Sequence, residues 1–346
     1  MSMINITDKV RQQGVLTDVT LELTYACNLD CFFCYNDRDK PGKGLSLAQY
    51  ETLLRDLAGM QTMFLMLTGG EPMIHPHFFE IGRLTKELGF VVRVRTNGHS
   101  LTRAMARRVR DEVMPYVVEV SLHGATADVH DQQTRIAGSF DRLVKNIASA
   151  VEEGLRISVV STPTAWNEHQ IEEMFALCDD LGVPLRFQGP VAPRDNGDTE
   201  PLEIQPTENA WEKVTRLVTE RKQQQDLQAN LGEPIQGVEV EIETKKPVAS
   251  CGVGVSGVDI DPYGNVLACM HLQETAGNVH DHSISDIWKD SPLFARARSR
   301  AEEAVQQFKN KPFKQLGAPI FCLAVEENMN KGCATECGTG CGRPTD

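Results

Sequence analysis

The strongest constraint on the fold is the alternation of apolar, β-branched segments with amphipathic segments between residues 19 and 188. The first kind has the length and composition of strands, and the second has the period of helices. Such alternation is typical of parallel strands joined by crossover helices. It suits a barrel and equally an open, doubly wound sheet, and in both folds ligands bind at the carboxyl ends of the strands. We expect strands at Val19–Thr24, Met63–Thr68, Val91–Thr96, Val117–Leu122, Arg156–Ser161 and Leu185–Gln188, and helices at Leu47–Ala58, Phe78–Leu88, Ala104–Glu112, Phe140–Glu153 and Ile171–Leu181.

Length and charge narrow the class of protein. The 346 residues are enough for one large α/β domain and a smaller one. The formal net charge of −13 argues against a nucleic-acid-binding surface and is compatible with a basic peptide substrate. The first residues lack the pattern of a signal peptide, and no segment approaches the ~18 apolar residues of a membrane span. We therefore expect a cytoplasmic protein, in which ten cysteines indicate metal ligands rather than disulfides.

Three cysteines follow the first expected strand in a C-x3-C-x2-C arrangement: Cys27, Cys31 and Cys34, hereafter the thiol triad. Three thiolates so close in one loop can bind three irons of a cubane [4Fe–4S] cluster and leave the fourth iron open to a small molecule. Structural zinc is the main alternative, but it takes four ligands, and no fourth Cys or His lies nearby. Disulfides would leave one cysteine of the three unpaired.

The triad and its place near the N-terminus resemble the radical S-adenosylmethionine (SAM) superfamily. The resemblance implies a partial (β/α)6 TIM-type barrel, a [4Fe–4S] cluster bound by the thiol triad, and SAM bound to the open iron. It also implies an electron donor such as flavodoxin or ferredoxin. Reductive cleavage of SAM would then give a 5′-deoxyadenosyl radical that abstracts a hydrogen atom from a substrate.

A Gly69-Gly70-Glu71 segment follows the second expected strand. Paired glycines at a strand end let the backbone approach a ligand closely, and a carboxylate there can accept hydrogen bonds from an ammonium group. Taken alone, the segment is a turn. It resembles the family's GGE motif, which holds the amino group of SAM, and so we expect these residues to bind SAM. Thr96-Asn97, after the third strand, is a turn signal and in the family lies near SAM.

The next two strands carry further candidates. The resemblance maps residues that contact the ribose and carboxylate of SAM onto Ser121, at the end of the fourth strand, and Arg135. Arginine suits this role because its guanidinium group can bind a carboxylate with two hydrogen bonds. A solvated arginine beside a helix is the alternative interpretation. Ser158 and Asn167, in and after the fifth strand, are candidates for lining the same site.

A second group of cysteines lies in the last hundred residues, after a charged amphipathic helix expected at Thr207–Leu227. Cys251 and Cys269 flank a β-hairpin whose turn contains Pro262-Tyr263-Gly264. The C-x12-G-x4-C spacing resembles the SPASM extension of radical SAM enzymes, which carries up to two auxiliary iron–sulfur clusters. The domains expected on this basis are a radical SAM core at 1–195, a linker with the charged helix at 196–245, and a small cysteine-rich SPASM-like domain at 246–346.

The distal cysteines, Cys322, Cys333, Cys337 and Cys341, depart from the family's spacing, C-x2-C-x5-C-x3-C followed by one more cysteine. The resemblance assigns Cys251, Cys269 and Cys341 to a first auxiliary cluster and the other three distal cysteines to a second. One cluster bound by Cys251, Cys269 and two distal cysteines is an alternative, and a zinc-bound tail is another. The sequence does not choose among them.

Chains of this kind most often modify ribosomally made precursor peptides by crosslinking, epimerisation or residue excision, and we expect this function here. Because the first strand is expected near Val19, an N-terminal leader-recognition domain does not fit, and we expect a separate recognition protein. Small-molecule tailoring is the first alternative: dehydrogenation, epimerisation or decarboxylation of a sugar, nucleoside or porphyrin. The second is an anaerobic sulfatase maturase, in which an acidic residue follows the hairpin's second cysteine; here Met270 and His271 stand there. The third, from another class, is a non-catalytic iron–sulfur scaffold.

Overall fold

The structure is a computed structural model that describes residues 13–189, 191–229, 249–250, 252, 254–308 and 320–321. The six expected strands are present, and each is followed by a crossover containing a helix except the last. The strands are β1 (Asp18–Glu22), β2 (Phe64–Thr68), β3 (Val91–Thr96), β4 (Val117–Ser121), β5 (Ile157–Ser161) and β6 (Leu185–Phe187). The main helices of this part are α2 (Leu47–Gly59), α3 (Phe78–Glu87), α4 (Arg103–Arg108), α5 (Ala127–Thr134), α6 (Ser139–Glu152) and α7 (Ile171–Asp180).

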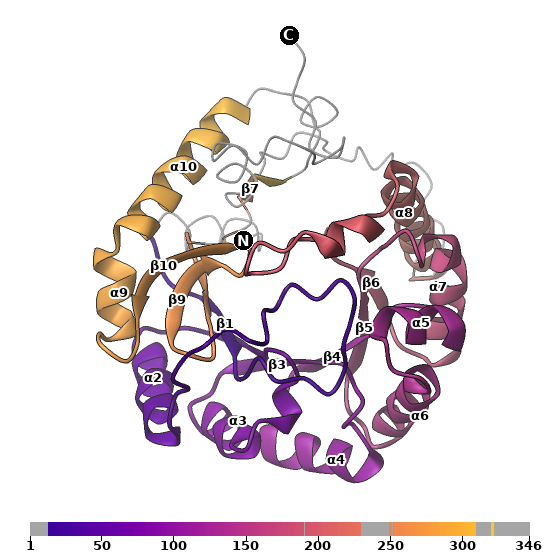
Figure 1. Cartoon of the computed structure of the whole chain (residues 1–346), viewed down its shortest axis with the longest axis horizontal. Helices are drawn as coiled ribbons and strands as arrows, with labels where there is room; N and C mark the ends of the chain where they lie inside the picture. The colour runs from indigo at the N-terminus through magenta and orange to yellow at the C-terminus, as the bar shows by residue number, and fades with distance from the viewer. Residues whose placement is uncertain are drawn as a thin grey trace.

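Strands β1 to β6 are parallel and lie in sequential order in one sheet. Sequential order means that every crossover runs in the same direction, so the helices lie on one side. Figure 1 shows the helices as an outer ring around the strands, with the loop after β1 crossing the centre. The described strands β6 and β10 form the two edges and do not pair, so the barrel is open. This confirms the partial barrel and excludes the doubly wound alternative.

The C-terminal hairpin continues this sheet. Its strands β8 (Gly257–Ile260) and β9 (Asn265–Cys269) are antiparallel, as predicted, and β10 (Leu272–Asn278) follows them. The pairing of β8 with β1, in parallel, was not predicted. The boundary between the core and the SPASM-like domain stays a prediction, but the hairpin and the barrel share one sheet of nine strands. The remaining elements are α8 (Glu208–Ala229), α9 (Ile284–Asp290), α10 (Pro292–Phe308), a short pair β7 (Ala249–Ser250) with β11 (Ile320–Phe321), and the single turns η1 (Pro72–Ile74), η2 (Val109–Val113), η3 (Glu168–Gln170) and η4 (Glu200–Ile204).

The two faces of the sheet differ in polarity. On β3, Val92 and Val94 are buried in the hydrophobic core together with Phe78 and Ile81 of α3. Successive residues of a strand point to opposite faces, so the residues between these valines face the barrel interior. Following the register across the sheet gives the inner layer: Asp18, Thr20, Glu22, Phe64, Met66, Thr68, Val91, Arg93, Arg95, Val117, Glu119, Ser121, Ser158, Val160, Arg186 and Asp259. The barrel interior is therefore mainly polar.

Two helical segments differ from expectation. Helix α5 was not predicted because its buried side chains, His130, Gln133 and Thr134, are polar and leave no apolar periodicity. The helix expected at Ala104–Glu112 is α4 followed by the π-helical turn η2, which ends at Met114 in the left-handed conformation. In the described part of the chain, no helix is both long and apolar enough to cross a membrane.

Candidate active site

The thiol triad lies in the loop between β1 and α2. Its cysteines are partly buried by accessible surface and form no disulfide with any described residue. Burial raises the pKa of all three thiols, and for Cys31 the other two sulfurs raise the pKa further. The charge of Arg38 acts in the opposite direction on each of them. The triad is thus a set of adjacent thiols that iron would deprotonate on binding.

The surroundings of Cys27 suit a thiolate. The backbone N–H of Leu29 and the side-chain amide of Asn97 both point at its sulfur, at 3.4 and 3.5 Å. No three metal-binding side chains among the described residues converge as they would around a single ion. Thiolates of a cubane cluster bind three different irons and so do not meet at one point. The triad therefore fits a [4Fe–4S] cluster better than zinc.

Positions 69 and 70 must be glycine because the backbone there packs directly against another segment of the protein's own backbone. A Cβ atom on Gly69 would lie 2.4 Å from the carbonyl oxygen of Thr24, and one on Gly70 would lie 2.3 Å from that of Ala26. Gly70 also donates a 2.6 Å hydrogen bond to Thr24. The end of β2 is thereby pressed against the segment that leads into Cys27. Space for a ligand was the reason expected from the sequence, and close packing is the reason that the structure gives.

Glu71 is completely buried and accepts hydrogen bonds from its own chain. The hydroxyl of Thr96 donates to both carboxylate oxygens at 2.8 and 2.9 Å, while the backbone N–H groups of Met73 and Asn97 donate at 3.0 and 2.8 Å. Burial raises the pKa of Glu71 to about 7, although these hydrogen bonds act in the opposite direction. Glu71 thus holds Asn97 beside Cys27. Direct contact of Glu71 with SAM stays a prediction.

The other predicted SAM-binding residues lie around the same end of the barrel. The Arg135 guanidinium carbon lies 4.7 Å from the centre of the Phe32 ring, inside the triad loop. Its nitrogens lie 3.7 Å from Asp30 and 3.6 Å from Glu200. Ser121 and Ser158 face the barrel interior, and neither hydroxyl forms a hydrogen bond with another described residue. By contrast, Asn167 is fully buried and bonds to backbone groups of its own loop and of His123, so its role is structural.

Sequence reasoning missed a carboxyl group that connects the barrel to the triad loop. Glu22, at the end of β1, is 3% exposed, and the Tyr35 hydroxyl donates to it at 2.8 Å. Burial raises the pKa of Glu22 to about 8; Tyr35 lowers it, and the charges of Asp259, Asp195 and Asp261 raise it. Burial therefore favours the neutral form of Glu22 at pH 7. The sequence held one indication of this role: Glu22 lies two residues after Thr20 on the same strand, so both side chains point to the same, inner face of the sheet.

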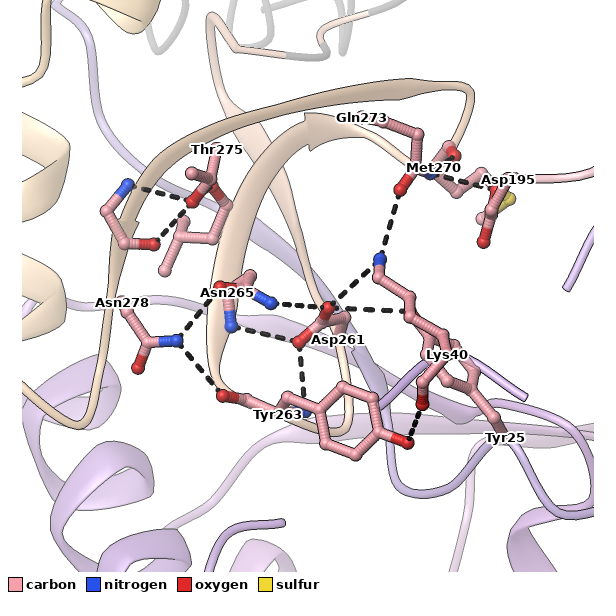
Figure 2. A network of polar contacts seen from close by, with 12 residues as sticks. Tyr25, Lys40, Asp195, Asp261, Tyr263, Asn265, Met270, Gln273, Thr275 and Asn278 are labelled. Carbon is pink, nitrogen blue, oxygen red and sulfur yellow. Dashed lines mark hydrogen bonds and ion pairs between the residues drawn. The ribbon is translucent and has the colours of Figure 1, made fainter. Parts of the chain in front are cut away.

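The C-terminal hairpin contacts the segment around Lys40 that follows the thiol triad. The Tyr263 hydroxyl donates to the carbonyl oxygen of Lys40 at 2.7 Å, and the Lys40 ammonium group lies 3.6 Å from Asp261 and 3.1 Å from Gln273 (Figure 2). A Cβ atom on Gly42 would overlap the Tyr263 ring at 2.1 Å, so this position requires glycine. The hairpin thus fixes the position of the loop that carries the triad.

The auxiliary ligands are only partly described. Cys269 ends β9, and the backbone N–H of His271 lies 3.5 Å from its sulfur. The other predicted auxiliary ligands lie outside the described residues: Cys251, Cys322, Cys333, Cys337 and Cys341. Their assignment to one or two clusters stays a prediction.

Comparisons with known proteins agree with this site. The family model of the radical SAM superfamily matches residues 21–181, and that of the SPASM iron–sulfur cluster-binding domain matches residues 251–315. Mycofactocin maturase MftC of Mycobacterium tuberculosis is 33% identical over 297 residues, which is 81% of this chain and 72% of MftC. An AdoMet-dependent heme synthase of Methanosarcina barkeri is 25% identical over 82% of this chain and 85% of its own length.

Solved structures agree in fold. The crystal structure of Streptococcus suis SuiB covers 86% of this chain and 71% of its own, with a TM-score of 0.64 and 17% identity. The same protein bound to its precursor peptide SuiA gives a TM-score of 0.63. Together with the two matching family models and the extended identity to MftC, these findings show that the chain belongs to the radical SAM superfamily and carries a SPASM domain.

Proposed function

We propose that this radical SAM enzyme modifies a ribosomally synthesised precursor peptide. The observation that carries the proposal is the 33% identity to the mycofactocin maturase over most of both chains. The fold shared with SuiB, which binds the precursor peptide SuiA, supports it. A polar barrel interior, open on one side, also suits a segment of peptide, because peptide groups need hydrogen-bonding partners when they leave water.

The cofactors predicted from the sequence, SAM and iron–sulfur clusters, are those of the two matched domains. We assign the SAM-binding cluster to Cys27, Cys31 and Cys34. A cluster held by these three cysteines would supply the electron for reductive cleavage of SAM, and the resulting 5′-deoxyadenosyl radical would abstract a hydrogen atom from the substrate. The protein binds and orients the reactants and excludes water from them.

The chain's own residues do this in three ways. Leu29 and Asn97 donate N–H groups to the Cys27 sulfur and so stabilise it as a thiolate. Glu71, through its hydrogen bonds with Thr96 and Asn97, fixes the loop beside it. Arg38 adds positive charge near all three sulfurs, which favours their anionic form. For SAM itself we propose contacts with Gly69, Gly70, Glu71, Thr96, Asn97, Ser121, Arg135 and Ser158.

Two partners remain predictions: a separate leader-recognition protein and an electron donor such as flavodoxin or ferredoxin. A pull-down with the tagged, anaerobically purified enzyme tests the first, and replacement of dithionite by reduced flavodoxin in the SAM-cleavage assay tests the second.

The function is tested by anaerobic reconstitution with iron, sulfide, SAM and reductant in the presence of a short peptide encoded beside the gene. We expect 5′-deoxyadenosine and a modified peptide in stoichiometric amounts, seen as a changed mass or, for an epimerisation, as deuterium uptake from D2O. A variant with Cys27, Cys31 and Cys34 replaced by alanine should give neither, while keeping the iron of the SPASM domain. Deoxyadenosine without any change of the peptide would argue against a peptide substrate.

The similarity to heme synthases favours one second candidate, oxidative tailoring of a small molecule such as a porphyrin. The same assay with a porphyrin in place of the peptide separates the two, because only the true substrate should be converted. A peptide that carries a cysteine or serine in a sulfatase motif tests the sulfatase-maturase alternative in the same way.

A further inference from the structure

Three arginines surround one carboxylate inside the barrel. Glu119, on the inner face of β4, is 1% exposed. Arg95 on β3 donates to its Oε2 through Nε at 3.1 Å and Nη2 at 2.7 Å. Arg186 on β6 donates to Oε1 at 2.6 Å, and a nitrogen of Arg93 lies 3.6 Å from the same oxygen. We call this group the arginine trio.

The trio carries more positive charge than Glu119 neutralises. Burial alone would raise the pKa of Glu119, but Arg95 and Arg186 hold it below the ordinary value, so Glu119 contributes one negative charge. Within the described part of the chain, the side chain of Arg93 forms no hydrogen bond, and Glu119 is its single ionic contact. Most N–H groups of Arg93 and Arg186 therefore remain available to another acceptor.

The other acidic groups of the interior do not neutralise the excess positive charge of the arginine trio. Asp259 on β8 is close enough for Arg95 to lower its pKa, which burial nevertheless raises to about 6. Glu22 is affected mainly by burial, by Tyr35 and by other carboxylates. The interior thus has a side with carboxyl groups on β1 and β8 and a basic side formed by the arginines of β3 and β6. Such a division can orient a polar substrate.

The guanidinium groups are also reachable. The side chains of Arg93 and Arg186 are 34% and 49% exposed, whereas the carboxylate between them is covered. Arg93 and Arg95 lie on β3, which leads into Asn97, and Glu119 lies on β4, which ends at Ser121, so the group is next to the predicted SAM site. An anion between Arg93 and Arg186 would therefore lie inside the barrel, below the carboxyl ends of the strands.

We propose that Arg93 and Arg186 bind a carboxylate group of the substrate in the barrel interior, and that Arg95 acts as a positioning residue by holding Glu119. The inference rests on the proposed peptide substrate only for the source of the carboxylate, which is a C-terminus or an Asp or Glu side chain. Guanidinium groups match carboxylates in shape and charge, and a partly enclosed site strengthens the pairing.

Paired peptide libraries test the proposal on the reconstituted holoenzyme with SAM. The probes are N-acetylated hexapeptides made as free acids and as C-terminal amides, each with Asp/Glu members and their Asn/Gln counterparts. Captured peptides are quantified by mass spectrometry after rapid filtration. We expect capture of a carboxylate-bearing member about tenfold above that of its neutral counterpart. The acid–amide pairs identify a C-terminal carboxylate, and the Asp–Asn and Glu–Gln pairs identify a side chain.

Variants make the test specific. Arg93→Gln and Arg186→Gln should each bring the ratio towards one with unchanged iron content. The melting temperature should stay unchanged in Arg93→Gln and fall in Arg186→Gln, because of the two only Arg186 donates a hydrogen bond to the buried carboxylate of Glu119. Arg156→Gln is the matched control: Arg156 stacks 4.5 Å from the Tyr116 ring at the opposite end of the barrel, and its loss should leave the ratio unchanged. Equal capture of charged and neutral peptides by the wild type, or a ratio unchanged in both trio variants, would overturn the proposal.

If no peptide is captured, the proposed peptide substrate is contradicted, and the carboxylate site itself is tested with a second pair of probes. Dissociation constants of succinate and succinamide are then measured by calorimetry. Stronger binding of succinate that is lost in Arg93→Gln and Arg186→Gln supports the carboxylate site. Equal or absent binding of the two probes rejects it.

Discussion

Replacing Glu22 by glutamine should stabilise the protein, and by an amount that grows with pH. Glu22 is buried with a pKa of about 8, against 4.5 for an ordinary glutamate. Its folded pKa is raised, so its contribution to stability is complete below pH 4.5 and is lost as the pH rises through 8. At 1.36 kcal/mol per pH unit, the loss is about 3 kcal/mol at pH 7 and about 5 kcal/mol at pH 9.

Glutamine removes this loss because it does not ionise. It keeps an oxygen that can accept the Tyr35 hydroxyl, which now donates to Glu22 at 2.8 Å. The charges of Asp259 and Asp195 now raise the pKa of Glu22, and a neutral amide is not repelled by them. The substitution therefore creates no unpaired buried acceptor of the kind that makes many polar changes costly.

The assay is anaerobic thermal unfolding of the reconstituted protein at pH 5, 7 and 9. We expect Glu22→Gln to raise the melting temperature little at pH 5, by about 5 °C at pH 7 and by more at pH 9. Glu51→Gln, on the exposed face of α2, is the control and should follow the wild type. Parallel curves for wild type and Glu22→Gln across the pH range would show that Glu22 is ionised in the folded protein, and the reasoning would fail.

Three further changes follow from the site. Replacing the thiol triad by alanine should remove about four irons and all SAM cleavage, with the iron of the SPASM domain retained, as measured by iron and sulfide analysis. Gly70→Ala places a Cβ atom 2.3 Å from the carbonyl oxygen of Ala26 and should cost about 1–3 kcal/mol or more of stability, seen as a lower melting temperature and incomplete iron loading. Thr96→Val removes the hydroxyl that donates to both oxygens of Glu71; we expect about 1–3 kcal/mol of lost stability and weaker SAM binding in equilibrium dialysis, and unchanged values would contradict the positioning role of Glu71.

The barrel could be predicted because apolar side chains recur at regular spacing along the outer face of its strands. Leu65 and Leu67 on β2 and Val118 and Val120 on β4 are all buried, and helices of matching period follow them. Helix α5 carries no such signal. The pairing of β8 with β1 joins segments more than two hundred residues apart, and nothing local in either strand specifies the partner.

The site could be predicted where chemistry depends on local spacing, as in the thiol triad. Gly69 and Gly70 were predicted because glycine lets the backbone approach a ligand. In the structure the glycines are needed because they pack against the backbone of Thr24 and Ala26. Glu22 and the arginine trio were missed for a general reason. Charged residues that alternate with buried valines, as Arg93 and Arg95 do, look like the solvent face of a half-buried strand. Only the curvature of the sheet into a partial barrel turns that face into an interior.

The same curved sheet shows why the hairpin matters beyond its cysteine. Because β8 pairs with β1, Asp259 joins Glu22 on the side of the interior that carries carboxyl groups, opposite the arginine trio on β3 and β6. The hairpin turn, through Tyr263 and Asp261, also holds Lys40 in the chain that leaves the triad (Figure 2). One wall of the predicted substrate space and one support of the cluster loop therefore come from the region matched by the SPASM domain. A substitution in that region should therefore affect both the substrate space and the cluster loop, so the two domains are best understood as one catalytic unit.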